Sequence, residues 1–184
     1  MTTGTNLVLV GPMGAGKTSV GKILADRLNL KFVDSDRELE GRCGADIPWI
    51  FDIEGEAGFR TRETEILTEL CNQSGILLAT GGGAVLSEKN RQMLRQAGIV
   101  VYLSATAEQI YHRVRHDSSR PLLQVENPQT AIADILTTRD PLYQEVADIV
   151  LNSSDKESPA SMATAVYNQL KSHYSDEFGL RNID

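Results

Sequence analysis

The sequence predicts a three-layer α/β domain (αβα) in which helices cover both faces of a five-stranded parallel sheet. Five short apolar runs indicate the strands, at 6–10, 31–34, 76–80, 99–103 and 148–151. Longer amphipathic stretches separate these runs, and buried strands that alternate with helices are typical of a parallel sheet covered on both faces. The 184 residues fit one domain with one sizeable core. We assign this domain to 1–174 and expect a flexible tail at 175–184.

Residues 11–19, GPMGAGKTS, follow the first strand and match the pattern G-x-x-x-x-G-K-[ST]. A helix should come next, because the stretch from Thr18 spaces its apolar residues along one helical face, at Val20, Ile23, Leu24 and Leu28. Between a strand and a helix, the glycines let backbone N–H groups converge on one anion, and the helix adds its positive dipole end. The pattern therefore predicts a loop that binds the phosphates of a nucleoside triphosphate, through Gly14, Ala15, Gly16, Lys17, Thr18 and Ser19.

Within this loop we expect Lys17 to reach the β and γ phosphates and the Thr18 hydroxyl to ligate Mg²⁺. Many such loops use an acid at the end of another strand to help hold the metal, but the third strand here ends in three glycines. Asp34, at the tip of the second strand, is the candidate for the Mg²⁺ shell. Asp36, two residues further on, can accept a proton or a hydrogen bond from a substrate hydroxyl. An alternative role for Asp34 or Ser35 is to cap the helix that follows.

Three further stretches supply groups for an acceptor site. Arg60 and Glu63 lie three residues apart in GFRTRE and face the same side of a helix, where Glu63 orients the guanidinium group. The third strand ends in TGGG, which exposes the backbone N–H of Gly82, and RDPLY places Arg139 shortly before a proline. Two guanidinium groups and a backbone donor suit a planar carboxylate. Each arginine alone would favour a solvated surface position, whereas their combination with a phosphate loop predicts a kinase for a small acid.

The segment 116–129, HDSSRPLLQVENPQ, interrupts the regular alternation after the fourth strand and contains Arg120. A loop of this length in a compact domain is usually functional and is often a lid. We expect a lid at about 114–127 and an acceptor-binding region at about 34–62. A lid that closes only over both ligands would keep water away from the phosphoryl group.

These motifs together resemble the shikimate kinases. The stretches that stand in that family's order and spacing, from about Leu7 to about Leu170, are GPMGAGKTSVG, FVDSD, IFDIEGEAGFRTRE, ATGGGAV, RPLL and RDPLY. The resemblance implies a P-loop NTPase fold of the nucleoside-monophosphate-kinase type. It also implies an enzyme that uses ATP and Mg²⁺ to phosphorylate the 3-hydroxyl of shikimate, a step toward chorismate and the aromatic amino acids.

The resemblance also implies roles for single residues. Asp36 would contact the shikimate hydroxyls, and Arg60, Arg139 and the backbone N–H of Gly82 would hold the carboxylate. Asp34 would hold the Mg²⁺ shell.

Three assignments depend on less regular parts of the chain. The resemblance implies that Arg120 closes over the phosphates, where it neutralises charge during transfer. Lys156, in SSDKES, falls where the family often places a residue along the adenine, although an exposed lysine is an equally good interpretation. Trp49 could flank the acceptor pocket, but a Trp among apolar neighbours is more often core packing.

Composition excludes several other classes of protein. The formal net charge of −7 argues against binding of duplex nucleic acid. No secretory signal and no run of roughly 18 apolar residues is present, which predicts a cytoplasmic protein without a membrane span. Cys43 and Cys71 are expected to be ordinary thiols, and the three histidines lack the spacing of metal ligands. Without an evident apolar surface stripe, we expect a monomer.

Two other functions remain open at the level of motifs. One is a different small-molecule P-loop kinase that acts on gluconate or on a nucleoside monophosphate, because paired arginines suit any small carboxylate. The other is a nucleotide-binding module without catalysis. An organised acceptor site beside the phosphate loop would argue against the second.

Overall fold

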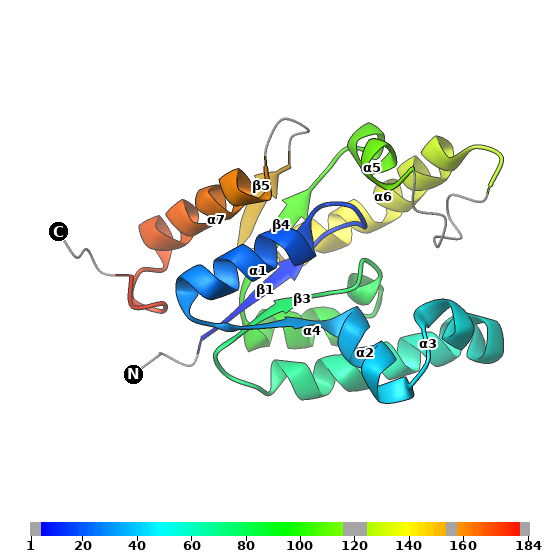
Figure 1. Ribbon diagram of the computed structural model, residues 1–184, viewed down its shortest axis with the longest axis horizontal. Helices are drawn as coiled ribbons and strands as arrows, with labels where there is room; N and C mark the ends of the chain where they lie inside the picture. Colours follow the sequence, from blue (N-terminus) through cyan, green and yellow to red (C-terminus); the bar gives the residue numbers. More distant parts are fainter. Residues whose placement is uncertain (1–4, 116–124, 154–157, 181–184) are drawn as a thin grey trace.

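The computed structural model describes residues 5–115, 125–153 and 158–180. Five parallel strands form one sheet in the order β2-β3-β1-β4-β5 (Figure 1). Their bounds are Asn6–Val10 for β1, Lys31–Asp34 for β2, Ile76–Ala79 for β3, Gly98–Ser104 for β4 and Ile149–Asn152 for β5. Every strand predicted from an apolar run is present within about one residue of its expected ends, which confirms the predicted fold class.

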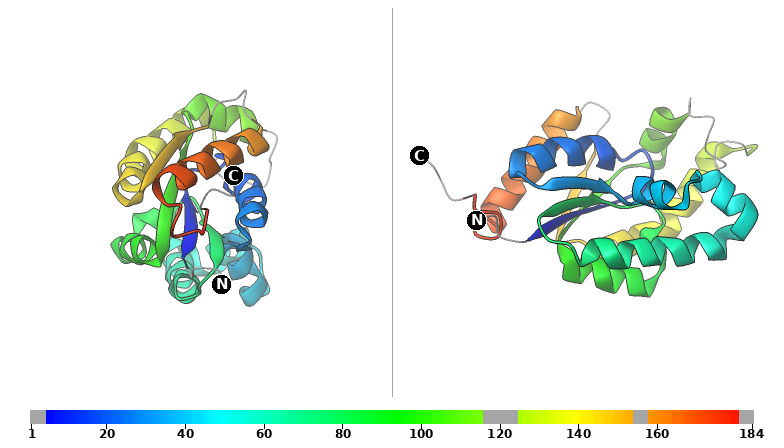
Figure 2. Two further views of the ribbon diagram at one scale, coloured as in Figure 1. Left: turned by 90° about the vertical axis from the view of Figure 1, so that its left-hand side faces the viewer. Right: turned by 60° about the horizontal axis from the view of Figure 1, so that its bottom comes forward.

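Helices cover both faces of the sheet, as the edge-on view in Figure 2 shows. The helices are α1 (Lys17–Leu28), α2 (Ser35–Cys43), α3 (Ile47–Cys71), α4 (Glu88–Ala97), α5 (Ala107–Val114), α6 (Pro128–Val146) and α7 (Pro159–His173), with a 3₁₀ turn at Ala84–Leu86. Helices α1 and α7 pack side by side on one face, and α3, α4 and α6 cover the other.

The central strand β1 explains why the core has two layers. Successive side chains of a strand point to opposite faces of the sheet. Leu7 and Leu9 accordingly contact the layer of α1 and α7, whereas Val8 and Val10 contact the layer of α3, α4 and α6. All four side chains are fully buried, which is why the strand reads as a continuous apolar run.

Two expectations from the sequence differ from the structure. The side chain of Trp49 is 53% exposed and lies neither in the core nor along the main cleft. It points outward from the first part of α3, while its neighbour Ile50 is buried. Part of the predicted tail is also packed: residues 175–180 form turns in which Phe178 and Leu180 contact the core layer of α1 and α7.

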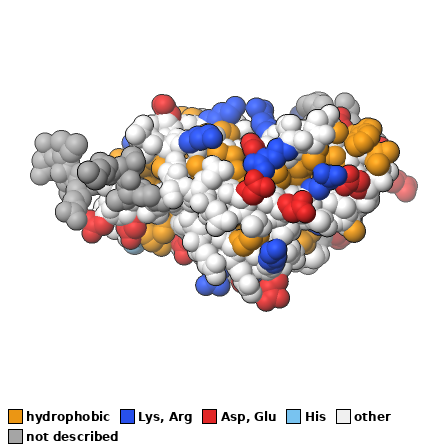
Figure 3. Space-filling model, turned by 90° about the horizontal axis from the view of Figure 1, so that it is seen from below, with side chains coloured by type: hydrophobic (Ala, Val, Ile, Leu, Met, Phe, Trp, Pro, Cys, Tyr) orange, Lys and Arg blue, Asp and Glu red, His pale blue; other side chains and the backbone are white. Residues whose placement is uncertain are grey.

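Among the described residues, no helix combines the length and the apolar content that a membrane span requires. The face drawn in Figure 3 carries acidic and basic side chains next to one another instead of a continuous basic tract.

Helix α1 can lie close to the sheet because residue 21 is glycine. A Cβ atom at Gly21 would lie 2.7 Å from Phe32 Cε2 and 3.1 Å from Leu77 Cδ2. We predict that Gly21→Ala lowers the free energy of unfolding by about 1 to 3 kcal/mol, because overpacking outweighs the better helix propensity of alanine. Chemical denaturation measures this change.

Gly41→Ala is the matched control, because Gly41 is also helical and a Cβ there would meet nothing within 4 Å. It should stabilise the protein by about 0.5 to 1 kcal/mol. Equal effects of the two substitutions would contradict the proposed packing.

Candidate active site

The loop after β1 has the backbone shape that its glycines allow. Gly14 and Gly16 adopt φ angles of 69° and 93°, which side chains strongly disfavour. The N-terminus of α1 has no side-chain cap and no acidic residue in its first turn, so its N–H groups and positive dipole end are available to an anion. Lys17 Nζ lies over the loop, where it donates to the carbonyl oxygens of Gly11 (2.7 Å) and Pro12 (2.8 Å).

Asp34 caps α2 and also contacts the phosphate loop. Its Oδ1 accepts hydrogen bonds from the backbone N–H groups of Asp36 and Arg37, and so caps α2. Its Oδ2 accepts a hydrogen bond from Thr18 Oγ1 at 2.8 Å. A hydroxyl and a carboxylate therefore lie together beside the phosphate loop. These are hard oxygen ligands of the kind that Mg²⁺ prefers.

One cleft of about 450 Å³ joins this loop to the predicted acceptor residues. The predicted site residues that line it are Gly14, Gly16, Lys17, Thr18, Ser19, Asp34, Asp36, Arg60, Gly82 and Arg139. Ala15 is buried behind the loop and lines a second, smaller cavity. Arg120 and Lys156 lie outside the described residues.

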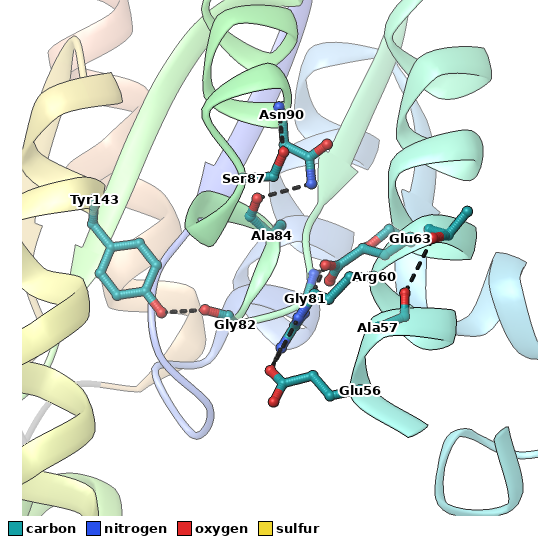
Figure 4. A network of polar contacts seen from close by, with 12 residues as sticks. Glu56, Ala57, Arg60, Glu63, Gly81, Gly82, Ala84, Ser87, Asn90 and Tyr143 are labelled. Carbon is teal, nitrogen blue, oxygen red and sulfur yellow. Dashed lines mark hydrogen bonds and ion pairs between the residues drawn. The ribbon is translucent and has the colours of Figure 1, made fainter. Parts of the chain in front are cut away.

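Glu63 orients Arg60, as the sequence predicted. Glu63 Oε2 lies 2.6 Å from Arg60 Nη1, and the two side chains are 3% and 22% exposed. Burial raises the pKa of the Glu63 carboxyl, and the positive charges of Arg60 and Arg139 oppose this rise. Figure 4 shows the pair beside the loop that follows β3. A Cβ at Gly83 would overlap the Arg60 guanidinium, so glycine is required there for the arginine to lie against the backbone.

Asp36 lies at the same end of the sheet in an unusual electrostatic environment. Burial, together with the negative charge of Asp34, raises the Asp36 pKa to about 6, although Lys17 opposes the shift. A Cβ at Gly81 would overlap Asp36 Oδ1, so this carboxylate lies directly against the loop after β3. A carboxyl group that titrates near neutral pH is well suited to accept a proton at physiological pH.

Several contributors to the site depend on contacts between distant parts of the chain. The Tyr143 hydroxyl donates to Gly82 O at 2.5 Å. Arg113 donates to Gly14 O at 3.1 Å and to Ser153 Oγ at 2.7 Å, across the smaller cavity of about 170 Å³ on the other side of the phosphate loop. Apolar side chains complete the main cleft, at Ile47, Phe51, Phe59, Ile110, Ile132, Ile135 and Leu136. Although Tyr143 belongs to the motif RDPLY, only the fold shows which distant residues it and Arg113 contact.

Comparisons with known proteins identify one family. The family model for shikimate kinase matches residues 13–171. Shikimate kinase of Pseudomonas aeruginosa (strain LESB58) is 56% identical over 151 residues, which are 82% of this chain and 88% of the relative. The structure of shikimate kinase from Acinetobacter baumannii in complex with shikimate superposes with a TM-score of 0.90 at 48% identity and covers 94% of this chain and 96% of that chain.

A gluconokinase from Sinorhizobium meliloti 1021 shares only the fold, with a TM-score of 0.63 at 15% identity over 99% of this chain and 100% of that chain. The two relatives that share about half of their aligned residues with this chain, over most of their own length, are both shikimate kinases. The chain belongs to the shikimate kinase family.

Proposed function

We propose that the main cleft transfers the γ-phosphoryl group of ATP to the 3-hydroxyl of shikimate. The observation that carries this proposal is that the phosphate loop and the acid-binding residues Arg60 and Arg139 line the same cleft. Phosphoryl transfer passes through a loose transition state, so the protein contributes mainly alignment and charge stabilisation. A cleft that holds both reactants is the arrangement this chemistry requires.

The phosphate loop forms the nucleotide half of the cleft. The N–H groups at the start of α1 and Lys17 hold the β and γ phosphates. The smaller cavity beside Arg113 and Ser153 continues from the same loop and accommodates the nucleoside. We assign Arg120 to charge neutralisation over the phosphates and Lys156 to the adenine side, as the family resemblance implies.

Thr18 and Asp34 would hold Mg²⁺, with Asp34 acting through the water shell. Mg²⁺ is usually held by one or two protein groups together with substrate phosphates and water. When bound, the ion neutralises negative charge on the phosphate oxygens.

The acceptor half of the cleft holds a small hydroxy acid. Arg60 and Arg139 bind its carboxylate together with the backbone N–H of Gly82, and the carboxylate–guanidinium geometry fixes the orientation of the ring. This places a ring hydroxyl beside Asp36, which accepts a hydrogen bond or the proton as the oxygen attacks phosphorus. A nucleotide-binding module without catalysis would not need this second set of groups.

A coupled assay of ADP release tests the acceptor directly. We expect strong activity with shikimate, and little with gluconate or with nucleoside monophosphates. A preference for gluconate or a nucleotide would overturn the assignment. We further propose that the enzyme acts as a cytoplasmic monomer, which light scattering of the purified protein checks for the oligomeric state.

Arg139→Ala should weaken shikimate binding by about 10- to 100-fold, because one charged hydrogen-bonding partner of the carboxylate is lost. ATP affinity should stay within a few-fold. Calorimetry with shikimate and with a non-hydrolysable ATP analogue measures both values. Arg95→Ala removes the same charge from an exposed position on α4 and should change neither. A collapse of nucleotide affinity in Arg139→Ala would instead assign this arginine to the nucleotide half of the cleft.

The rate should depend on the ionisation of Asp36. Because the pKa of Asp36 is about 6, its carboxylate is lost as the pH falls below that value. We predict that kcat/KM for shikimate falls about tenfold per pH unit below about pH 6 and is nearly constant above it. Asp36→Asn should be far less active and should lack this inflection. A wild-type profile that stays level down to about pH 5 would contradict the assignment.

The raised pKa has a second consequence, for stability. Asp36 titrates higher in the folded chain than at its ordinary value of 3.8, so its ionisation opposes folding as the pH rises through about 6. Asp36→Asn should therefore raise the melting temperature at neutral pH while it lowers activity.

Arg120→Ala tests the proposed closure over the phosphates. We expect kcat to fall by about 100-fold or more, because charge stabilisation in the transition state is lost, while shikimate affinity changes little. Single-turnover rates and calorimetry give the two quantities. Equal losses in turnover and in shikimate binding would argue against this role.

A further inference from the structure

We infer that Tyr143 is a positioning residue that fixes the glycine loop at Gly82 for the acceptor's carboxylate. This inference rests on the proposed function of the cleft. It adds a residue that does not contact the acceptor itself, because Tyr143 is fully buried and does not line the cleft.

The hydroxyl of Tyr143 joins α6 to the glycine loop of the acceptor half. It donates a 2.5 Å hydrogen bond to Gly82 O, across 61 positions of the sequence (Figure 4). Burial raises the pKa of Tyr143 to about 12, although the positive charge of Arg139 opposes the rise. The hydroxyl therefore keeps its proton at neutral pH and remains a donor to Gly82 O.

The ring of Tyr143 is itself held in one place. It stacks on Tyr102 with ring centroids 5.0 Å apart. The Tyr102 hydroxyl donates to Asp140 Oδ1 at 2.5 Å, and Gln144 Nε2 donates to Asp140 Oδ2. The stacked rings hold α6 against β4, so the Tyr143 hydroxyl is presented to Gly82 from a rigid part of the fold, and Tyr102→Phe would keep this stack.

Gly82 needs such a contact because it is the middle residue of three consecutive glycines. Glycine has the widest choice of backbone angles of any residue, so this loop has little intrinsic preference for the conformation in which the Gly82 N–H faces the acceptor. A hydrogen bond to the carbonyl of Gly82 fixes the peptide plane on one side of that residue. The neighbouring turn, closed by the bond from Ala84 N–H to Gly81 O, limits the other side.

Tyr143→Phe tests the inference, since it removes the hydroxyl and keeps the ring. Shikimate affinity should fall about five- to tenfold, the loss expected for one hydrogen bond, and affinity for an ATP analogue should stay within about twofold. Tyr102→Phe is the matched control, because it removes a hydroxyl from the other ring of the same stack without a contact to the cleft. It should leave shikimate affinity within about twofold.

A double-mutant cycle with Arg139→Ala and an exchange measurement separate positioning from a general structural effect. Tyr143→Phe should weaken shikimate binding by less than about twofold when Arg139 is already Ala, because the two groups act on one carboxylate. Amide hydrogen exchange at Gly82 and Gly83 should speed up in Tyr143→Phe and not in Tyr102→Phe.

Three outcomes would overturn the inference: unchanged shikimate affinity in Tyr143→Phe, an equal loss for the ATP analogue, or an equal loss in Tyr102→Phe. Wild-type protein that neither binds nor phosphorylates shikimate would instead overturn the proposed function itself.

Discussion

Parallel pairing of β1 with its neighbour β3, and of β3 with β2, is the constraint on which the site depends. Leu9 is in register with Ala79, and Ala79 with Asp34, so all three strands end at the same edge of the sheet. The residues that follow each strand therefore meet there. Strand β1 leads into the phosphate loop, β3 leads into the glycine loop at 81–83, and β2 ends at Asp34, two residues before Asp36. No local interaction could bring these three segments together without that register.

The charges at this edge are arranged in opposed pairs. The buried carboxylate of Glu63 holds Arg60, and the burial that fixes the pair also raises the Glu63 pKa. Lys17 lowers the pKa of Asp36, while Asp34 and burial raise it. Removing one charged side chain from such a pair would leave the other partly desolvated and unpaired, which would lower the stability of the folded protein. In the proposed reaction, these pairs allow the cleft to hold two anionic reactants beside the ionisable carboxyl group of Asp36.

Most of the fold could be predicted because strands buried on both faces read as continuous apolar runs. Residues that line the cleft could be predicted where they belong to the glycine-rich pattern, as Lys17 does, or come soon after a strand, as Asp36 and Gly82 do. The core position predicted for Trp49 was wrong: this residue is 53% exposed, in the part of α3 that precedes the kink at Gly55. An apolar pattern carries no information about such a kink, and the sequence motifs do not show which distant residues Tyr143 and Arg113 contact.

The glycine loop at 81–83 packs against both the phosphate loop and Arg60. A Cβ at Gly82 would lie 3.4 Å from the backbone nitrogen of Met13, so one side of this loop packs against the phosphate loop. At the adjacent residue, Gly83, the Arg60 guanidinium occupies the space of a side chain. The loop after β3 thus packs against both halves of the cleft with bare backbone. In the proposed reaction, a side chain at Gly83 would displace the Arg60 guanidinium, and the acceptor that this arginine holds would lose its alignment with the phosphates.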